Sequence, residues 1–568
     1  MTAWVIPHHG PPMRAKGKIA LDQGNRPLPV APGALSPGSS AMSAGPPRGG
    51  RRCGRLGTVD ESPPMRQLPG WLGPVWAWPA LVTLAVTGAG VGAAQPWRDE
   101  LATWSAATRP LGDLARMAGV IDAASWPYYL LLHGWVAAFG DSPTALRLPS
   151  VLAAAGTAGL TAALGGRLFG QRAGLLGGLL FAVLPGTSRY AQEARPYAFV
   201  ALFAVLATLL LVRALDRPGW RSWAGYAAAV AGLGLAHLVA ITLLAAHAAT
   251  APCARRAPAP PPVGAPRAVP GRARRPRPPW GWLAAVLAAL VVLAPLVVLA
   301  VGQRGRQLDW VDRARPADLT ALPGALAQSG AVGGLLLGLA ALGAARWGRR
   351  ALLPAACVAL PVLLVFLAGL AGPLWVPRYL FFTVPFACVL AGAALGAGAA
   401  RPAASVPAGA GVALPAALAV VLLAGLLGLP DQAALRRSHE WPRDALVDYR
   451  GAARVVDEGR RPGDVIVFAP RNGWLFLDLG VRYHLGDRQP RDALVVRDRN
   501  ARGDYWADEC PRPAECLAGV DRVWLVVAGR RADPVGAVPG VAGDALRDGF
   551  TVERVRPRPG LTVALLTR

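Results

Sequence analysis

Apolar stretches long enough to cross a membrane recur along the chain from Trp71 to about Pro430, and short polar turns separate them. A hydrocarbon core of roughly 30 Å needs about 20 apolar residues in one helix. The pattern therefore predicts a polytopic α-helical membrane protein in a plasma membrane, surrounded by membrane lipid. The expected spans are 72–94, 146–166, 173–188, 197–213, 280–301, 328–345, 351–371, 379–399 and 408–429.

One further apolar stretch, 224–250, has Gly234 and His237 near its middle. It fits either one tilted helix or two short helices that turn at His237. With two helices, the arginine-rich loop over 255–277 falls on the cytoplasmic side, as the positive-inside rule favours. We therefore predict about eleven spans, a cytoplasmic N-terminus and an external C-terminus.

The two ends of the chain differ from this middle region. Residues 1–70 are rich in Pro, Gly, Ser and Arg without an apolar period, so we predict a disordered cytoplasmic tail. Residues 431–568 show a soluble α/β pattern, with a helix over 444–458, strands over 464–468 and 523–528, and two more strands within 550–567. These boundaries leave 71–430 as the transmembrane domain, with a first external loop over 95–145.

Composition removes several classes of function. With 53% apolar and only 16% charged residues, the chain cannot clothe the surface of a cytosolic enzyme. The net charge of +26 comes from arginine throughout the chain, while the C-terminal domain is nearly neutral, so we expect no nucleic-acid partner. No phosphate-binding Walker loop or dinucleotide fingerprint is present in the sequence, which leaves ATP-driven transport unsupported.

Cysteines offer one candidate cross-link. Cys510 and Cys516 lie close together in the C-terminal domain, and an external compartment would permit a disulfide bond between them. Two unpaired thiols are the alternative, because sequence spacing does not fix the geometry.

Two charged segments are candidates for chemistry. Trp97-Arg98-Asp99-Glu100 follows the first span, and adjacent carboxylates at a membrane boundary are costly unless they meet water, a cation or a substrate. The second segment, 189–197, places Glu193 and Arg195 in a very short external turn, where Gly, Asn or Asp would be usual. Glu193, Arg195 and Asp99 can share one outer site if the helices bundle. The alternative for each segment is a solvated loop or a plain turn.

Between these segments, residues 126–135 are apolar and aromatic but too short to span. We expect a helix that lies in the plane of the membrane interface, with His133 as part of that anchor.

Four motifs in this order resemble the membrane glycosyltransferases of superclass C (GT-C). They are Arg98-Asp99-Glu100, the Tyr-Tyr-Leu-Leu-Leu-His segment over 128–133, Ala145-Leu146-Arg147-Leu148-Pro149-Ser150, and Tyr190-Ala191-Gln192-Glu193-Ala194-Arg195-Pro196-Tyr197. Within the class, the chain resembles the bacterial branch related to protein mannosyltransferases and aminoarabinose transferases, and its α/β tail resembles that of actinobacterial members. One departure is Ser125-Trp126-Pro127, where relatives often have a His before the Tyr pair.

The resemblance implies an enzyme that moves a sugar, mannose- or arabinose-like, from a polyprenyl-phosphate carrier to an acceptor hydroxyl at the outer face. The acceptor would be a glycan, a lipid or a protein. It places the general base on Asp99, with Glu100 beside it and Glu193 as the second-loop acid. Because a lipid phosphate leaves without a proton, one base is enough, and attack opposite the leaving group inverts the anomeric centre.

Cationic and aromatic groups would then hold the substrates. Guanidinium groups bind phosphate bidentately, and Arg195 and Arg378 are the candidate clamps. The full expected substrate-binding set is Arg98, Arg195, Tyr197, His237, Arg378 and Tyr379. Arg378 instead snorkels, and His237 instead packs on a neighbour, in the alternative interpretation.

Two further expectations concern other ligands. Asp99 and Glu100 are candidate ligands for a divalent cation, Mg or Mn, with no cofactor certain. Gln303, Arg304 and Arg306 begin a later external loop and are weaker candidates for the same site.

Two other functions fit parts of the pattern. A secondary transporter or lipid flippase also has many spans with charges, although such charges would lie deep between related halves. A non-catalytic scaffold built on the C-terminal domain leaves the segments around Asp99 and Glu193 without a purpose.

Overall fold

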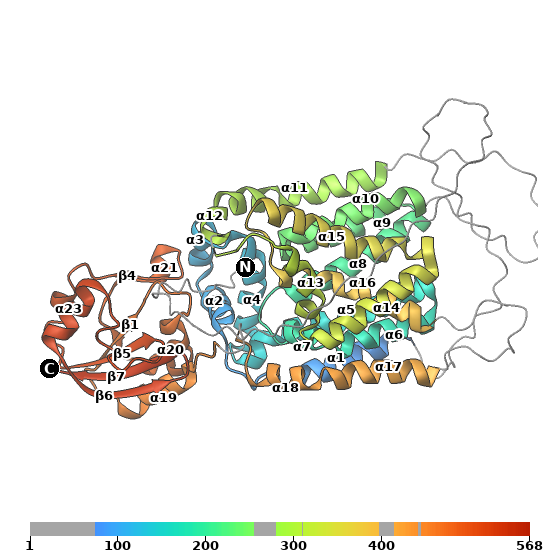
Figure 1. The fold of residues 1–568 in the computed structure, drawn as a ribbon. Coiled ribbons are helices and arrows are strands. Elements are labelled where there is room, and N and C mark those ends of the chain that lie inside the picture. The colour runs from blue at the N-terminus through green and yellow to red at the C-terminus, as the bar shows by residue number, and fades with distance from the viewer. Residues whose placement is uncertain (1–73, 255–279, 309, 397–413, 441–444) are drawn as a thin grey trace, which may run out of the picture.

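A bundle of helices and a smaller α/β domain lie at opposite ends of the molecule, with a layer of short helices between them (Figure 1). The computed structural model describes residues 74–254, 280–308, 310–396, 414–440 and 445–568. The tail expected over 1–70 and the basic loop over 255–277 lie outside the described residues.

The bundle contains the apolar stretches that the sequence indicates. Its helices are α1 (Ala77–Gly88), α5 (Pro143–Phe169), α6 (Gln171–Val183), α7 (Pro185–Ala191), α8 (Tyr197–Asp216), α9 (Trp220–Ala236), α10 (Leu243–Ala254), α11 (Trp280–Gly302), α12 (Arg304–Leu308), α13 (Pro316–Ala327), α14 (Gly330–Trp347), α15 (Leu352–Ala371), α16 (Val384–Gly396), α17 (Leu414–Leu427) and α18 (Leu429–Arg437).

Length and composition identify the helices that can cross a membrane. Within the described residues five helical stretches pass that test, and the bent pair α17–α18 makes a sixth. One of the five, Gly330–Ala371, has 42 residues, about twice what one crossing needs, and therefore accommodates two of the expected spans. The multi-pass α-helical class is confirmed, and the number of spans stays a prediction.

Glycines let three central helices approach backbone to backbone. A Cβ on Gly174 of α6 would lie 2.2 Å from the Ala162 carbonyl oxygen of α5, and one on Gly392 of α16 would lie 2.3 Å from the Ala173 carbonyl oxygen of α6. Small residues at such crossings allow the close packing that holds membrane helices together. This α5–α6–α16 core supports the turn between α7 and α8.

The chain breaks at His237, so the stretch 224–250 forms two short helices and not one tilted helix. Helix α9 ends at Ala236, His237 is extended, and a 3-10 helix, η3 (Leu238–Thr242), leads into α10. His247 of α10 contacts Tyr226 of α9 through a hydrogen bond of 3.0 Å, so the two segments run back along each other. This turn leaves the His237 ring 6.3 Å from that of Tyr197, at the start of α8.

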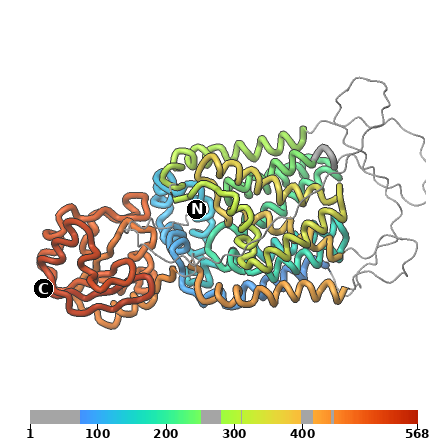
Figure 2. The backbone as a smooth tube through the Cα atoms, in the orientation of Figure 1, coloured from blue at the N-terminus to red at the C-terminus, as the bar shows by residue number. Residues whose placement is uncertain are grey.

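Three short helices cap the end of the bundle nearest the C-terminal domain: α2 (Arg98–Ala107), α3 (Leu111–Val120) and α4 (Trp126–Phe139). A helix is present over the expected segment as α4, which buries Tyr128 and Tyr129 while Leu130 and Leu131 are exposed, and its position in the membrane interface stays a prediction. Figure 2 shows these helices, in blue, between the bundle and the C-terminal domain.

The C-terminal domain is built on a five-stranded sheet with the order β2-β1-β5-β7-β6. Strands β2, β1 and β5 are parallel, and β7 and β6 continue the sheet antiparallel. The main elements are α19 (Tyr449–Gly459), β1 (Val465–Ala469), α20 (Leu477–Leu485), β2 (Arg491–Asp492), β5 (Arg522–Ala528), α23 (Gly540–Gly549), β6 (Thr551–Arg558) and β7 (Leu561–Thr567). The α/β prediction is confirmed. The four strands that the sequence indicated are present, and the helix expected over 444–458 begins later, at Tyr449.

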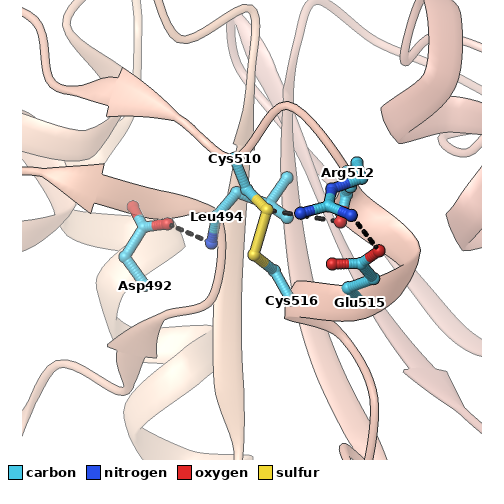
Figure 3. The surroundings of a disulfide bond; sticks show 6 residues. All are labelled: Asp492, Leu494, Cys510, Arg512, Glu515 and Cys516. Atoms are coloured by element: carbon cyan, nitrogen blue, oxygen red, sulfur yellow. Dashed lines mark hydrogen bonds and ion pairs between the residues drawn. A yellow bond between two sulfur atoms is a disulfide. The ribbon is translucent and has the colours of Figure 1, made fainter.

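A disulfide bond joins Cys510 to Cys516 beside the small sheet of β3 (Val495–Arg497) and β4 (Asp508–Glu509) (Figure 3). The bond closes a short turn, in which Arg512 and Glu515 form an exposed ion pair of 2.9 Å.

The α/β domain and the capping layer share one hydrophobic core and several buried hydrogen bonds. Asp122 accepts from the hydroxyl of Tyr129 in α4 at 2.5 Å and from the hydroxyl of Tyr505 in the C-terminal domain at 2.8 Å. Arg109 donates to the Asp504 carbonyl oxygen at 2.6 Å. The layer that carries Asp99 is therefore fixed from both sides.

Candidate active site

Four segments that are distant in sequence meet where the capping layer joins the bundle. They are the first turn of α2, the turn between α7 and α8, the 3-10 helix η5 (Pro377–Thr383), and the linker that follows α18. The two acidic segments expected to share one site are therefore brought together. An Arg378 guanidinium nitrogen lies 3.9 Å from Asp99 Oδ2, and Arg189 lies 3.9 Å from Glu193 Oε1.

Glu100 belongs to the framework of this site. Its carboxylate accepts hydrogen bonds from Arg147 Nε at 2.7 Å and Nη2 at 2.6 Å, and from the Ala194 N–H at 2.9 Å. Arg147 also donates to the carbonyl oxygens of Val91 and Ala94. The Arg147 guanidinium holds the pKa of Glu100 far below its usual range, although burial opposes this shift. Glu100 thus ties α2, α5 and the α7–α8 turn together.

This geometry corrects the expectation that Glu100 serves as a metal ligand, because N–H donors already occupy its two oxygens. No group of three or more His, Cys, Asp and Glu side chains that could hold a metal ion occurs within the described ranges. The donor set therefore does not fit a bound Mg or Mn ion at Asp99 and Glu100.

Asp99 lies beside Glu100 but has the opposite environment. Its side chain is only 2% exposed, yet Oδ2 makes no hydrogen bond to any residue that the structure describes. Arg378 lies across from it on η5, and its Nε and Nη2 atoms likewise make no hydrogen bond to a described residue. The Arg378 side chain is 11% exposed, but these two nitrogens are buried, so they and the Asp99 carboxylate, 3.9 Å apart, keep hydrogen-bonding capacity for a third group.

Glu193 repeats this arrangement in the α7–α8 turn. It is 1% exposed, and neither carboxylate oxygen has a hydrogen-bond partner among the residues placed by the structure. Burial raises the pKa of Glu193, and the Arg189 guanidinium opposes that shift. Arg189 in turn lies over the Trp97 ring at 4.7 Å, which brings the turn against the start of α2.

Arg195 is buried and contacts two of the three helices of the capping layer, α2 and α4. One guanidinium nitrogen donates to Thr103 of α2 at 3.3 Å and to the Tyr129 hydroxyl of α4 at 3.4 Å. This nitrogen therefore orients the layer, and the expected role of Arg195 as a phosphate clamp stays a prediction.

Aromatic rings from three elements form one wall of the cluster. The ring of Tyr379 lies 4.4 Å from that of His237 and 6.4 Å from that of Tyr197. Both tyrosine hydroxyls and both imidazole nitrogens are buried and lack a hydrogen-bond partner in the described part of the chain. Three of the expected substrate-binding residues are thus brought together with polar atoms available to a ligand. Arg98, also expected there, is buried at the start of α2 with its guanidinium 5.8 Å from the Trp97 ring.

Two of the weaker candidates hold the framework instead. Gln303 donates to the Ala118 carbonyl oxygen at 2.8 Å and accepts from the Ala123 N–H at 2.9 Å, and Arg306 pairs with Asp504 at 2.8 Å. Arg304 is exposed. The expectation that these three residues face the site is therefore wrong, because Gln303 and Arg306 join α11 and α12 to α3 and the C-terminal domain.

Sequence reasoning assigned no role to four buried charged or titratable residues of the cluster: Arg147, Arg189, His439 and Glu440. Arg147 and Arg189 lie in segments that the sequence had singled out, so a signal existed for both. His439 and Glu440 lie in the polar linker after α18, and nothing in that composition distinguishes them from solvated residues.

Comparison with known proteins agrees with this architecture. Residues 127–252 match the model of the dolichyl-phosphate-mannose-protein mannosyltransferase family. That segment runs from α4 through α10 and includes the α7–α8 turn with Glu193 and Arg195. No curated protein sequence matches the chain.

Solved membrane-protein structures share the fold of this chain. It is similar to the structure of ArnT from Cupriavidus metallidurans in the apo state, with a TM-score of 0.55, 13% identity, and coverage of 87% of this chain and 98% of that one. It is equally similar to ArnT from Cupriavidus metallidurans bound to undecaprenyl phosphate, with a TM-score of 0.55, 14% identity and the same coverage. The GT-C resemblance expected from the sequence is confirmed for the fold.

Proposed function

We propose that the chain is an inverting glycosyltransferase that moves a sugar from a polyprenyl-phosphate carrier to an acceptor hydroxyl, with Asp99 as general base. One observation carries the proposal. Asp99, Glu193, Arg378, Tyr197 and Tyr379 come from three segments that are distant in sequence, and each has buried polar atoms that no described residue satisfies. Buried polar groups are normally hydrogen-bonded, so such a set is typical of a substrate site.

The comparisons support the choice of carrier. ArnT with the same fold has been solved with undecaprenyl phosphate bound, and the matched family model concerns transfer from a dolichyl phosphate sugar. Both donors are polyprenyl phosphates. The sugar, mannose- or arabinose-like, and the acceptor remain part of the proposal, as does the placement of this site on the outer face of the plasma membrane.

The local chemistry fits such a transfer. Departure of the lipid phosphate develops no new need for a proton, so the leaving group requires cationic stabilisation, which Arg378 is placed to give. The carboxylate of Asp99 lies next to that guanidinium and can take the proton of an acceptor hydroxyl that binds beside the pair. Glu100 positions Asp99, because its ion pair with Arg147 fixes the first turn of α2.

Replacing the base tests the proposal. We expect Asp99→Asn to lower sugar transfer by about 100- to 10,000-fold, because the amide keeps the shape but cannot accept the proton. The assay follows transfer of radiolabelled mannose or arabinose from a polyprenyl phosphate into an isolated cell-envelope fraction. Asp113→Asn is the matched control, because Asp113 forms an exposed ion pair with Arg116 on α3.

Three outcomes are informative. Transfer by the wild type and by Asp113→Asn, with loss in Asp99→Asn, supports the assignment. Undiminished transfer in Asp99→Asn removes Asp99 as the base. Wild-type protein that transfers neither sugar, yet carries a labelled lipid across a vesicle membrane, favours the flippase alternative.

A further inference from the structure

Glu440 lies in the linker between α18 and the C-terminal domain, yet its side chain is buried. It is 3% exposed, and His439 beside it is 2% exposed. The backbone N–H of Glu440 donates to Ser438 Oγ at 3.1 Å, and His439 Nδ1 lies 3.7 Å from Glu100 Oε2. The linker is therefore held against the first turn of α2 at a defined position.

This anchoring places the Glu440 carboxyl among the charged groups of the candidate site. The groups that act on it electrostatically come from α2 and α7, and they are Arg98, Asp99, Glu100 and Arg189. Tyr449, at the start of α19, also senses its charge. Neither oxygen of Glu440 makes a hydrogen bond to a residue within the described ranges. The framework around Glu100 thus does not need Glu440.

The environment also fixes the form of this carboxyl group. Burial raises the pKa of Glu440 to about 8, against the lowering effect of Arg98 and Arg189. At pH 7 the group is therefore mainly the neutral acid, which offers one O–H donor and one carbonyl acceptor. A sugar hydroxyl, which both donates and accepts, matches that pair of functions.

We propose that Glu440 contacts the substrate directly and that its buried, unpartnered carboxyl group binds a sugar or acceptor hydroxyl in the Asp99 site. The inference rests on the proposed function. It adds a substrate-binding residue from outside the membrane-embedded part of the chain, so the linker to the C-terminal domain becomes part of the active site. Asp99 stays the base, because Glu440 in its neutral form cannot accept a proton.

The acid form predicts a direction for the pH dependence. As pH rises through about 8, Glu440 ionises, loses its donor, and adds a negative charge next to Asp99. Wild-type transfer should therefore fall on the alkaline side. Glutamine keeps the donor and the acceptor but cannot ionise, so transfer by Glu440→Gln should not show that fall.

The test compares two variants in full-length protein, with exposed Glu458→Gln of α19 as the control. The probes are polyprenyl-phosphate mannose and polyprenyl-phosphate arabinose, with label counted in an isolated cell-envelope fraction from pH 6 to pH 9. We expect Glu440→Gln to keep transfer within about 3-fold at pH 7, and Glu440→Ala to lose roughly 10- to 100-fold, because alanine leaves the bound hydroxyl unpaired. A rise in KM for the donor assigns the hydroxyl to the transferred sugar, and a rise in KM for the acceptor fraction assigns it to the acceptor.

Several results would overturn the proposal. Full activity in Glu440→Ala means that the group does not touch substrate. Equal loss in Glu440→Gln and Glu440→Ala, with Glu440→Gln melting like the wild type, means that the ionised form is required. An alkaline limb that survives in Glu440→Gln means that another group causes the fall, which also overturns the proposal. This readout holds even where the alanine variant fails to fold. Wild-type protein without any transfer refutes the proposed function instead.

Discussion

Two clusters of charged side chains in this molecule differ in how closely their opposite charges are paired. In the C-terminal domain, Arg471 contacts Glu509 at 2.6 Å and Asp492 at 2.8 Å, while Arg499 contacts Asp478 at 2.8 Å. Around Asp99, the nearest oppositely charged atoms are 3.9 Å apart in two pairs.

The difference separates charges that hold the fold from charges that are available to a ligand. A buried charge is tolerated when hydrogen bonds and an opposite charge satisfy it. The carboxylates of the Arg471 cluster meet that condition within the protein, although Arg471 Nη1 and two Arg499 nitrogens lack a hydrogen-bond partner among the described residues. The Glu100–Arg147 pair meets it at 2.6 Å. The Asp99 and Glu193 carboxylates meet it only in part, so a substrate with hydroxyl and phosphate groups can complete it. Changes in the first kind of cluster should therefore alter stability, and changes in the second should alter activity.

The largest effect on stability is expected from Arg147→Met. The substitution leaves Glu100 buried without its partner and removes donors from two backbone carbonyls, so we expect a loss of about 3–5 kcal/mol in the free energy of unfolding. Thermal unfolding in detergent, followed by size-exclusion chromatography, measures it. The exposed Arg213→Met on α8 is the control. Equal melting temperatures for the two variants would contradict the framework role of Arg147.

A smaller effect, and one on activity alone, is expected from Glu193→Gln. Transfer should fall by roughly 10- to 100-fold, because the charge that faces the substrate is lost. The melting temperature should change little, since no described residue hydrogen-bonds to these oxygens and the pair with Arg189 is long, at 3.9 Å. A fall in melting temperature with unchanged transfer would place Glu193 in the framework instead.

The smallest effect is expected from Asp492→Asn in the satisfied cluster. Arg471 keeps Glu509 and one oxygen of the asparagine, so we expect a loss of about 1 kcal/mol. Sugar transfer should stay within about 2-fold of the wild type, and limited proteolysis should show more rapid cleavage of the C-terminal domain. A large loss of transfer without faster cleavage would mean that this cluster also serves the reaction, and the contrast would fail.

The sequence predicted more of the fold than of the site, for a physical reason. Apolar length identified the bundle, and the alternation of apolar runs after Pro430 identified the sheet, because both patterns are local. The break at His237 could be chosen because the positive-inside rule acts on the loop that follows. The two-residue strands β2 and β4 are too short to leave such a pattern.

Within the site, residue type indicated the location but not each role. Asp99 and Glu100 are adjacent acids with the same sequence context, yet Arg147, which lies 47 positions later on α5, engages only Glu100. The choice between them depends on a contact between distant segments. Glu440 was missed for the same reason, because only the folded linker brings it against α2.

The position of Glu440 after the last described helix of the bundle has a consequence for biosynthesis. A ribosome must complete more than three-quarters of the 568 residues before this carboxyl exists, and by then the segments that carry Asp99, Glu193 and Arg378 have already emerged. The nascent chain therefore gains its complete site only when the linker docks and the final domain begins to fold. The candidate site is therefore among the last parts of this molecule to be completed during synthesis.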